Sequence, residues 1–312
     1  MSGPALVVFA AGKGTRLRPL TDRLPKPMVP VLDVPMVDLA LARGRSTKWD
    51  ACFVNVSGPS PGLREHLASL HPTVTILEEG DEPVGQAATL RRLLPRLTDP
   101  VVTCNSDLVS DMDLGQLLHQ HAAAGRRCTL AVSRVEGGAD LTATADGTVT
   151  LLDRRFENSA GYLFLGAACF TRPLLEAIPP LEPLGLVTGV LRGAVASGDV
   201  ALYEHRGFAE DAGSLDRYLS VSVAALGRPE LCPSTPGEVS RDRCYRGPGT
   251  RISAGAVLDK GAIVLAGASV GDGARLRDCI VWPSSEVPEG SDLTAGIWFD
   301  GRWLEAGTAF SA

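Results

Sequence analysis

The sequence contains few lysines, few aromatic residues and no long apolar run. Aromatic side chains make up 5% of the 312 residues, and lysine occurs only four times among 30 basic residues. No apolar segment approaches the length needed to cross a bilayer. The N-terminal apolar run is too short for a signal peptide and is not preceded by the basic region that a signal peptide has. The formal net charge of −6 argues against nucleic acid or a membrane surface as a partner. We therefore expect a cytoplasmic protein that meets any anionic ligand with a local basic site.

The sequence also lacks the patterns of disulfide frameworks and metal clusters. Its seven cysteines are odd in number and widely spaced, and no two of them form a C-x-x-C pair. The five histidines form no metal-binding or nucleophile–base motif. These absences argue against a zinc site and a disulfide-stabilised fold, and the cysteines in apolar runs are expected to be small buried hydrophobes.

The N-terminal segment combines an apolar run, a glycine loop and two basic residues. Residues 5–10 predict a short buried strand, and Gly12 and Gly14 then allow a tight turn whose backbone N–H groups can face a phosphate. Arg16 can offer a bidentate fork to phosphate oxygens, and Lys26 a mobile point charge. Together these features predict a polyphosphate-binding loop.

Two familiar phosphate-binding motifs do not fit this loop. The dinucleotide fingerprint needs a third glycine where Leu17 stands, and a P-loop needs Ser or Thr where Gly14 follows Lys13. Residues 12–21 and 25–27 instead read G-K-G-T-R-L-R-P-L-T and P-K-P. This pattern resembles the opening motif of the sugar-1-phosphate nucleotidyltransferases, also called NDP-sugar pyrophosphorylases.

The resemblance implies a role for each residue of the motif. The nucleotide would be bound by Ala11, Gly12, Gly14, Thr15 and Arg16. Lys26 would contact the phosphates at the reacting centre, including that of the sugar phosphate. The expected substrates are a nucleoside triphosphate and a sugar-1-phosphate.

Two aspartates match the family's metal ligands. Asp107 follows the apolar run 101–103, which places it at the carboxyl end of a predicted strand, with Ser106 where the family has glycine. Asp211 opens the segment Asp-Ala-Gly-Ser, which matches the family's Asp-x-Gly-Thr motif, and Ser214 would suit a helix N-cap. Carboxylates and substrate phosphates are typical ligands of Mg²⁺. The resemblance therefore implies Mg²⁺ held by Asp107 and Asp211.

The base and sugar subsites are less sharply marked. Gly85 and Gln86 resemble the loop and helix start that face the nucleotide base, although a plain helix start with a solvated Gln86 fits equally well. On the sugar side we assign Asn105, Arg154 and Gly166, the last within the predicted strand 162–170. The family's Glu-Lys-Pro motif is absent. Its nearest counterpart is the segment 152–157. Here Arg154 or Arg155 would contact the phosphate, and Asp153 or Glu157 would contact the sugar hydroxyls. A solvated hairpin arm is the alternative interpretation of this segment.

The first two thirds of the chain alternate strand-like and helix-like segments. Strands are expected at residues 51–56, 73–77, 101–103 and 129–132, a helix starting near Pro35, and a hairpin at Asp146-Gly147 between residues 141–143 and 148–151. This rhythm, with the resemblance, predicts a doubly wound mixed α/β sheet, with ligands beyond the carboxyl ends of its strands. The expected catalytic domain covers residues 1–226, followed by a linker at 227–250.

A six-residue repeat begins after the linker. Large apolar residues recur at Ile252, Leu258, Val264, Val270, Leu276 and Trp282. This spacing resembles the hexapeptide repeat of left-handed parallel β-helices, here a short one at residues 251–290 with a C-terminal tail at 291–312. The repeat contains no histidine, which argues against an acetyltransferase. We expect structural support or homo-oligomerisation instead.

The resemblance implies transfer of a nucleoside monophosphate from the triphosphate to the sugar-1-phosphate, with release of pyrophosphate. A catalytic domain followed by a short β-helix resembles mannose-1-phosphate guanylyltransferases, which favours GTP, while UTP and dTTP stay open. The alternative is a catalytically weak regulatory subunit that binds NDP-sugars, which the lost Glu-Lys-Pro motif and the two serine replacements would suit.

Overall fold

The computed structural model describes residues 3–145, 147–151 and 160–306. Arg154, predicted to contact the sugar phosphate, and its neighbours Asp153, Arg155 and Glu157 lie outside the described residues. The chain divides into two compact units, one formed by Met1–Lys13 with Ala40–Ala209 and the other by Gly14–Leu39 with Glu210–Ala312. Among the described residues, no helix has the length and apolar character needed to cross a membrane.

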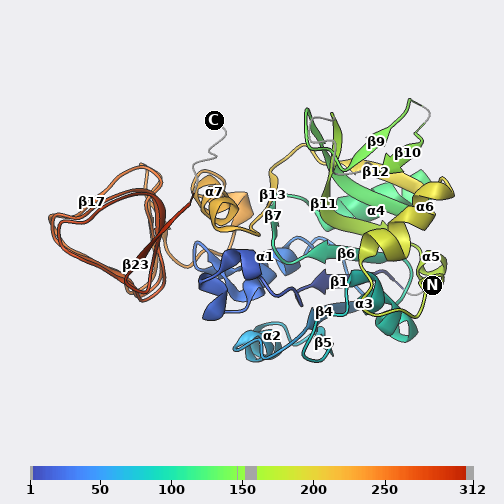
Figure 1. Ribbon diagram of the computed structural model, residues 1–312, viewed down its shortest axis with the longest axis horizontal. Coiled ribbons are helices and arrows are strands. Elements are labelled where there is room, and N and C mark those ends of the chain that lie inside the picture. The colour runs from blue at the N-terminus through green and yellow to red at the C-terminus, as the bar shows by residue number, and fades with distance from the viewer. Residues whose placement is uncertain (1–2, 146, 152–159, 307–312) are drawn as a thin grey trace. The chain divides into compact units, whose positions relative to one another are not determined.

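The first unit is built on a mixed sheet. Its strands are β1 (Ala5–Phe9), β4 (Ala51–Val56), β5 (Val74–Glu78), β6 (Val101–Asn105), β8 (Cys128–Val135), β9 (Leu141–Ala143), β10 (Val149–Leu151), β11 (Gly161–Phe170) and β12 (Val200–Glu204). The order is β10-β9-β11-β6-β1-β4-β5, with β8 paired to β11 and β12 to β8 (Figure 1). Strands β6, β1, β4 and β5 are parallel, whereas β11 runs antiparallel to β6 and β8. The predicted mixed α/β sheet is therefore confirmed.

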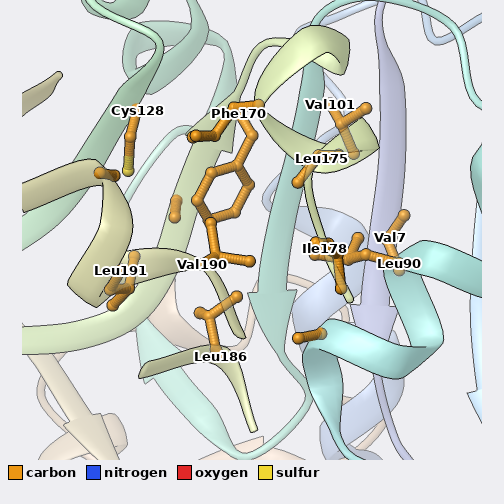
Figure 2. Close-up of a cluster of buried hydrophobic side chains, with 14 of the residues drawn as sticks. Val7, Leu90, Val101, Cys128, Phe170, Leu175, Ile178, Leu186, Val190 and Leu191 are labelled. Atoms are coloured by element: carbon orange, nitrogen blue, oxygen red, sulfur yellow. The ribbon is translucent and has the colours of Figure 1, made fainter. Parts of the chain in front are cut away.

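Helices connect and cover these strands. They are α1 (Met36–Ala42), which spans the boundary between the units, and α2 (Leu63–Leu70), α3 (Gln86–Leu93), α4 (Leu114–Ala124), α5 (Arg172–Glu176) and α6 (Arg192–Ala196). Figure 2 shows part of the core, where the Phe170 ring lies near Leu186 and Val190 of the segment before α6 and near Cys128 of β8. The 310 helix Leu94–Arg96, the π-helix Val187–Leu191 and the short strand β7 (Leu108–Ser110) also belong to this unit.

The predicted strands of the first unit are confirmed with small shifts in their bounds. The hairpin prediction also holds, since β9 and β10 pair antiparallel and Gly147 has a φ of 84°, a conformation that favours glycine. The helix expected near Pro35 begins at Met36. Continuous apolar runs predicted the central strands, because β1 and β6 are buried on both of their faces.

The second unit joins the segment after the glycine loop to the C-terminal third of the chain. It contains the 310 helices Thr15–Leu17, Leu20–Asp22, Lys26–Met28 and Pro229–Leu231, the hairpin β2 (Pro30–Val31) and β3 (Val34–Pro35), helix α7 (Leu215–Ala225) and the strands β14 (Glu238–Val239), β15 (Tyr245–Arg246), β16 (Arg251–Ile252), β17 (Val257–Leu258), β18 (Ile263–Val264), β19 (Ser269–Val270), β20 (Arg275–Val281), β21 (Glu286–Val287), β22 (Asp292–Phe299) and β23 (Arg302–Glu305). Strand β13 (Ala209–Asp211) spans the boundary.

Most C-terminal strands stack in parallel at a regular offset. Arg251 pairs with Ser269 and Ser269 with Glu286, so the partner lies 18 residues further on in the first step and 17 in the second. The same offsets recur between β15, β18 and β20. Figure 1 shows the chain running around a three-sided outline that includes β17 and β23. The offset of about three hexads per turn is the spacing that the repeat predicted.

The hexad prediction fails at its last member. Ile252, Leu258, Val264, Val270 and Leu276 all pack in one apolar cluster, which continues with Val281 rather than Trp282. The step from Leu276 to Val281 is five residues, which accounts for the change from an 18- to a 17-residue offset. Trp282 instead contacts the rings of Tyr218 and Phe299, with ring centroids 6.2 and 5.4 Å away.

The predicted domain boundaries also require correction. Within the expected linker 227–250, Tyr245 is fully buried in the strand ladder, and its hydroxyl donates to the Leu32 carbonyl at 3.0 Å. Within the expected tail 291–312, β22 pairs with β20 over six residue pairs. The Tyr218 hydroxyl of α7 donates to the Pro30 carbonyl at 2.6 Å. Polar and glycine-rich composition suggested a linker, but the buried Tyr245 anchors this segment, and pairing with β20 anchors β22.

Candidate active site

The first part of the glycine loop lies at the carboxyl end of β1. The Ala10 N–H donates to Asn55 Oδ1 at 2.7 Å, and Ser57 Oγ donates to the Ala11 carbonyl at 2.7 Å. Gly12 is exposed, and a Cβ added there would meet nothing within 4 Å. Two anchored residues thus lead into an open backbone segment, as a loop that receives a ligand requires.

The second part of the loop belongs to the second unit. Gly14 adopts a φ of 63°, and its carbonyl accepts a hydrogen bond from Thr21 Oγ1 at 2.9 Å. A Cβ on Gly14 would lie 2.9 Å from Lys26 Cβ, so glycine is required here by both conformation and space. This turn begins the 310 helix that carries Thr15 and Arg16, both exposed.

Arg16, Lys26 and Asp211 converge around Gly213 in the second unit. A Cβ placed on Gly213 would lie 2.5 Å from Asp211 Oδ1, 2.9 Å from Arg16 Nη2 and 3.4 Å from Lys26 Nζ. Residues separated by almost 200 positions therefore meet at one point. Two cations and one carboxylate around a bare backbone segment can bind a phosphate and a metal ion.

Two further groups hold the Asp211 carboxylate in place. Oδ1 accepts from the Gly213 N–H at 3.1 Å, and Oδ2 is paired with the Arg217 guanidinium. Ser214 occupies the N-cap position of α7 as predicted, but its side chain makes no capping hydrogen bond. Arg217 was not predicted as a site residue. The sequence does contain a signal for it, because Arg217 lies in the first turn of a helix that follows Asp211.

Asp107 lies in the first unit, in the tight turn between β6 and β7. It is half-buried, and the Ser106 N–H before it donates to the Phe9 carbonyl at 3.0 Å. The turn therefore sits against the end of β1, next to the start of the glycine loop. The two predicted metal ligands belong to different units, Asp107 to the first and Asp211 to the second.

Gln86, Asn105 and Gly166 meet in the first unit. Gln86 Nε2 donates to Asn105 Oδ1 at 2.7 Å, and a Cβ on Gly166 would lie 2.5 Å from Asn105 Nδ2. Gly166 has a φ of 74°, and the pairing of β11 with β8 shifts register around it. Gly166 thus makes room for Asn105, the neighbour assigned to the sugar side, and Gln86 holds that amide.

Gly85 has a role that the sequence did not reveal. Its φ is 88°, and a Cβ would lie 2.5 Å from the Leu184 carbonyl oxygen. The same carbonyl accepts from the Ala87 N–H at 3.1 Å. The absent side chain at Gly85 therefore lets the protein's own backbone approach the start of α3.

A buried polar network connects the glycine loop to α3. Asn55 Nδ2 donates to Glu79 Oε1 at 2.7 Å, and Glu79 Oε2 accepts from the Val84 N–H at 3.1 Å. Thr89 Oγ1 donates to Glu79 Oε1 at 2.5 Å, and all three polar side chains are buried. Sequence reasoning missed this network, but Asn55 and Glu79 stand at the carboxyl ends of β4 and β5, where the fold class places its ligands.

Similarity to known proteins extends over most of the chain. The family model described as nucleotidyl transferase matches residues 5–140. A mannose-1-phosphate guanylyltransferase of Mycobacterium tuberculosis is 27% identical over 91% of this chain and 81% of its own length. A mannose-1-phosphate guanyltransferase of Hypocrea jecorina is 26% identical over 95% of this chain and 87% of its own length.

The solved structures show the fold. A Bacillus anthracis protein, provisionally described as a glucose-1-phosphate thymidylyltransferase, superposes with a TM-score of 0.61 at 16% identity, over 72% of this chain and 95% of that one. The nucleotidyl transferase match at the N-terminal end and the similarity to mannose-1-phosphate guanylyltransferases over most of the chain agree with the resemblance of the opening motif.

Proposed function

We propose that this protein transfers a nucleoside monophosphate from a nucleoside triphosphate to a sugar-1-phosphate. A phosphate oxygen of the sugar-1-phosphate attacks the α-phosphorus, the new O–P bond forms, and the bond to the β-phosphate oxygen breaks. Pyrophosphate leaves with the electron pair of that bond. The reaction needs no covalent enzyme intermediate, so positioning and charge neutralisation carry the catalysis.

The meeting of Arg16, Lys26 and Asp211 is the observation that carries this proposal. Arg16, with the backbone of residues 12–15, would bind the triphosphate and the departing pyrophosphate. Lys26 would contact the phosphates at the reacting centre. Arg16 Nη2 and Lys26 Nζ would lie 2.9 and 3.4 Å from a Cβ added at Gly213. This closeness supports a shared phosphate site, because a cation contacts a phosphate only at short range.

Asp107 and Asp211 fit a magnesium ion by their chemistry. Asp107 lies in a turn and Asp211 ends β13. Hard oxygen donors of this kind, completed by substrate phosphates and water, suit Mg²⁺. The ion would supply positive charge to the phosphates. Arg217 and the Gly213 N–H hold the orientation of Asp211, and the turn before β7 holds Asp107.

We favour GTP and mannose-1-phosphate as the substrate pair. The support is that relatives named for this guanylyl transfer align over more than nine tenths of the chain. UTP and dTTP remain part of the test, since the Gln86 amide, a candidate base contact, is bonded to Asn105.

We also propose that the C-terminal strands form a short left-handed parallel β-helix that supports a homo-oligomer. The 18- and 17-residue offsets support the coil. In its first turn Val257 is half exposed, and Ile252 and Leu258 are only partly buried. Terminal turns of repeat structures commonly expose apolar side chains in this way unless they are covered. Light scattering of the full chain, compared with a Val257→Glu variant, would test this: a single monomeric mass for both rejects the oligomer.

Two matched variants test the catalytic proposal. Arg16→Ala should lower the rate of pyrophosphate release at least about 100-fold, because one charged contact in a phosphate site contributes about 3 kcal/mol. Arg18→Ala removes an exposed arginine paired with Asp22 at 3.3 Å and should keep the wild-type rate. Equal rates for wild type and the Arg16 variant would reject the assigned site, and tight NDP-sugar binding without turnover would favour a regulatory subunit.

A further inference from the structure

Arg43 is a buried cation that the proposed reaction does not use directly. Only 8% of the residue is exposed, although arginine is almost always at the surface. Its Nη1 donates to the Leu108 carbonyl at 2.5 Å and to Ser110 Oγ at 3.1 Å, and its Nη2 donates to the Asn105 carbonyl at 3.2 Å. The guanidinium therefore bridges the two ends of the turn that contains Asp107.

The backbone of Arg43 is anchored as well. Its carbonyl accepts from the Leu114 N–H at the start of α4, at 3.1 Å. Arg43 thus links the end of α1 to the β6–β7 turn and to α4. Because the backbone of Arg43 is tied to α4 and its guanidinium to the β6–β7 turn, the turn cannot move without breaking several hydrogen bonds.

The buried environment of Arg43 destabilises a charged side chain. Burial lowers the pKa of Arg43, opposed by the nearby Cys104 and Asp107. Its Nε has no hydrogen-bond partner among the described residues. A buried charge of this kind contributes less stability than an apolar side chain of similar volume. What it supplies here is geometry: a planar fork that fixes two carbonyl oxygens, which an apolar residue cannot do.

The residues that Arg43 fixes are those of the proposed site. Asn105 has its carbonyl bound by Arg43 and its side-chain amide bound by Gln86 at 2.7 Å. Asp107 lies between the two carbonyls that accept from Arg43. We propose that Arg43 is a positioning residue that holds the 105–108 turn so that Asn105 and Asp107 meet the sugar phosphate and its metal ion in a fixed geometry. This inference rests on the proposed function.

Substitution of Arg43 separates a positioning role from a purely structural one. Arg43→Met keeps the length of the stem and removes the fork, and Arg43→Lys keeps the charge but can satisfy fewer acceptors. Arg45→Met, two residues away, removes an exposed arginine and serves as the matched control. Each variant should be characterised by kcat, the KM of each substrate, the melting temperature and the Kd of Mn²⁺, measured by EPR with a non-hydrolysable nucleotide present.

We expect kcat to fall about 100-fold in Arg43→Met and about 10-fold in Arg43→Lys, because a misplacement of about 1 Å has effects of this size. The KM for the nucleotide should stay within about threefold, since Arg16 and Lys26 are untouched, and the Kd of Mn²⁺ should rise. A fall in kcat with unchanged Mn²⁺ binding also supports the inference and places the effect on Asn105. Arg45→Met should match the wild type in every measurement.

Several results would overturn the inference. Wild-type kcat in a folded Arg43→Met or Arg43→Lys variant shows that the fork only supports the fold. If Arg43→Met does not fold, Arg43→Lys decides, because it keeps a buried cation. If the wild-type protein releases no pyrophosphate, the proposed function itself is refuted. This result is obtained before any variant is compared, so the two failures are distinguishable.

Discussion

Gly213→Ala should slow turnover strongly without unfolding the protein. The added methyl would lie 2.5 Å from Asp211 Oδ1, which is about 0.9 Å inside the ordinary contact limit of 3.4 Å, and 2.9 Å from Arg16 Nη2. Both groups must therefore move by a few tenths of an ångström to about 1 Å. A misplacement of 1 Å lowers turnover on the order of 100-fold, which corresponds to about 2.7 kcal/mol. Steady-state pyrophosphate release measures this effect.

A second glycine provides the control for this prediction. Gly193 lies in α6, and a Cβ there would meet nothing within 4 Å. Gly193→Ala should keep full activity and raise the free energy of unfolding by about 0.5 kcal/mol, because alanine loses less entropy in a helix. Wild-type kcat and KM in a folded Gly213→Ala variant would refute the convergence of Arg16 and Asp211 at this point.

Three stability predictions follow from buried groups. Asp33 accepts from the Ala266 N–H and shares the Tyr245 hydroxyl proton with the Leu32 carbonyl, so Asp33→Ala should lower the free energy of unfolding by about 2 kcal/mol in urea titrations. Burial raises the pKa of Asp33 above 3.8, so the native state binds its proton more tightly. The contribution of protonated Asp33 to the free energy of unfolding is therefore complete below pH 3.8 and should decline as the pH rises. The Asp33→Asn variant should not show this decline. Thr89→Val keeps the side-chain volume but removes a donor to the buried Glu79 and should cost about 1 to 3 kcal/mol, measured the same way. Trp282→Ala should cost about 3 to 5 kcal/mol, seen as a lower melting temperature; a loss under about 1 kcal/mol would contradict its packing.

The elements of the sheet were predictable because their signal is local. The apolar runs of β1, β4 and β6 record burial on both faces, and Gly147 marks a turn through a conformation that glycine favours. The hexad likewise predicted the spacing of the C-terminal coil. It could not predict the five-residue step from Leu276 to Val281, because both Val281 and Trp282 are apolar and only packing against Tyr218 distinguishes them.

The site was predicted in part, and the missing part is non-local. The family pattern named Arg16, Lys26 and Asp211, and the structure brings these three together. Arg43 and Glu79 were missed because their roles depend on partners far away in the chain, such as Leu108 and Asn55. A charged residue on the buried face of a predicted helix was the available signal for Arg43. Gly85 was placed in the right loop, but its neighbour is the Leu184 carbonyl.

The central claim is nucleotidyl transfer to a sugar-1-phosphate. It is tested most directly by pyrophosphate release from the wild-type protein with Mg²⁺, over a grid of GTP, UTP, dTTP, ATP and CTP against mannose-, glucose-, N-acetylglucosamine- and galactose-1-phosphate. The account predicts one dominant combination, GTP with mannose-1-phosphate, and loss of that signal on addition of EDTA. No release in any combination, with nucleotide binding confirmed by calorimetry, would contradict it.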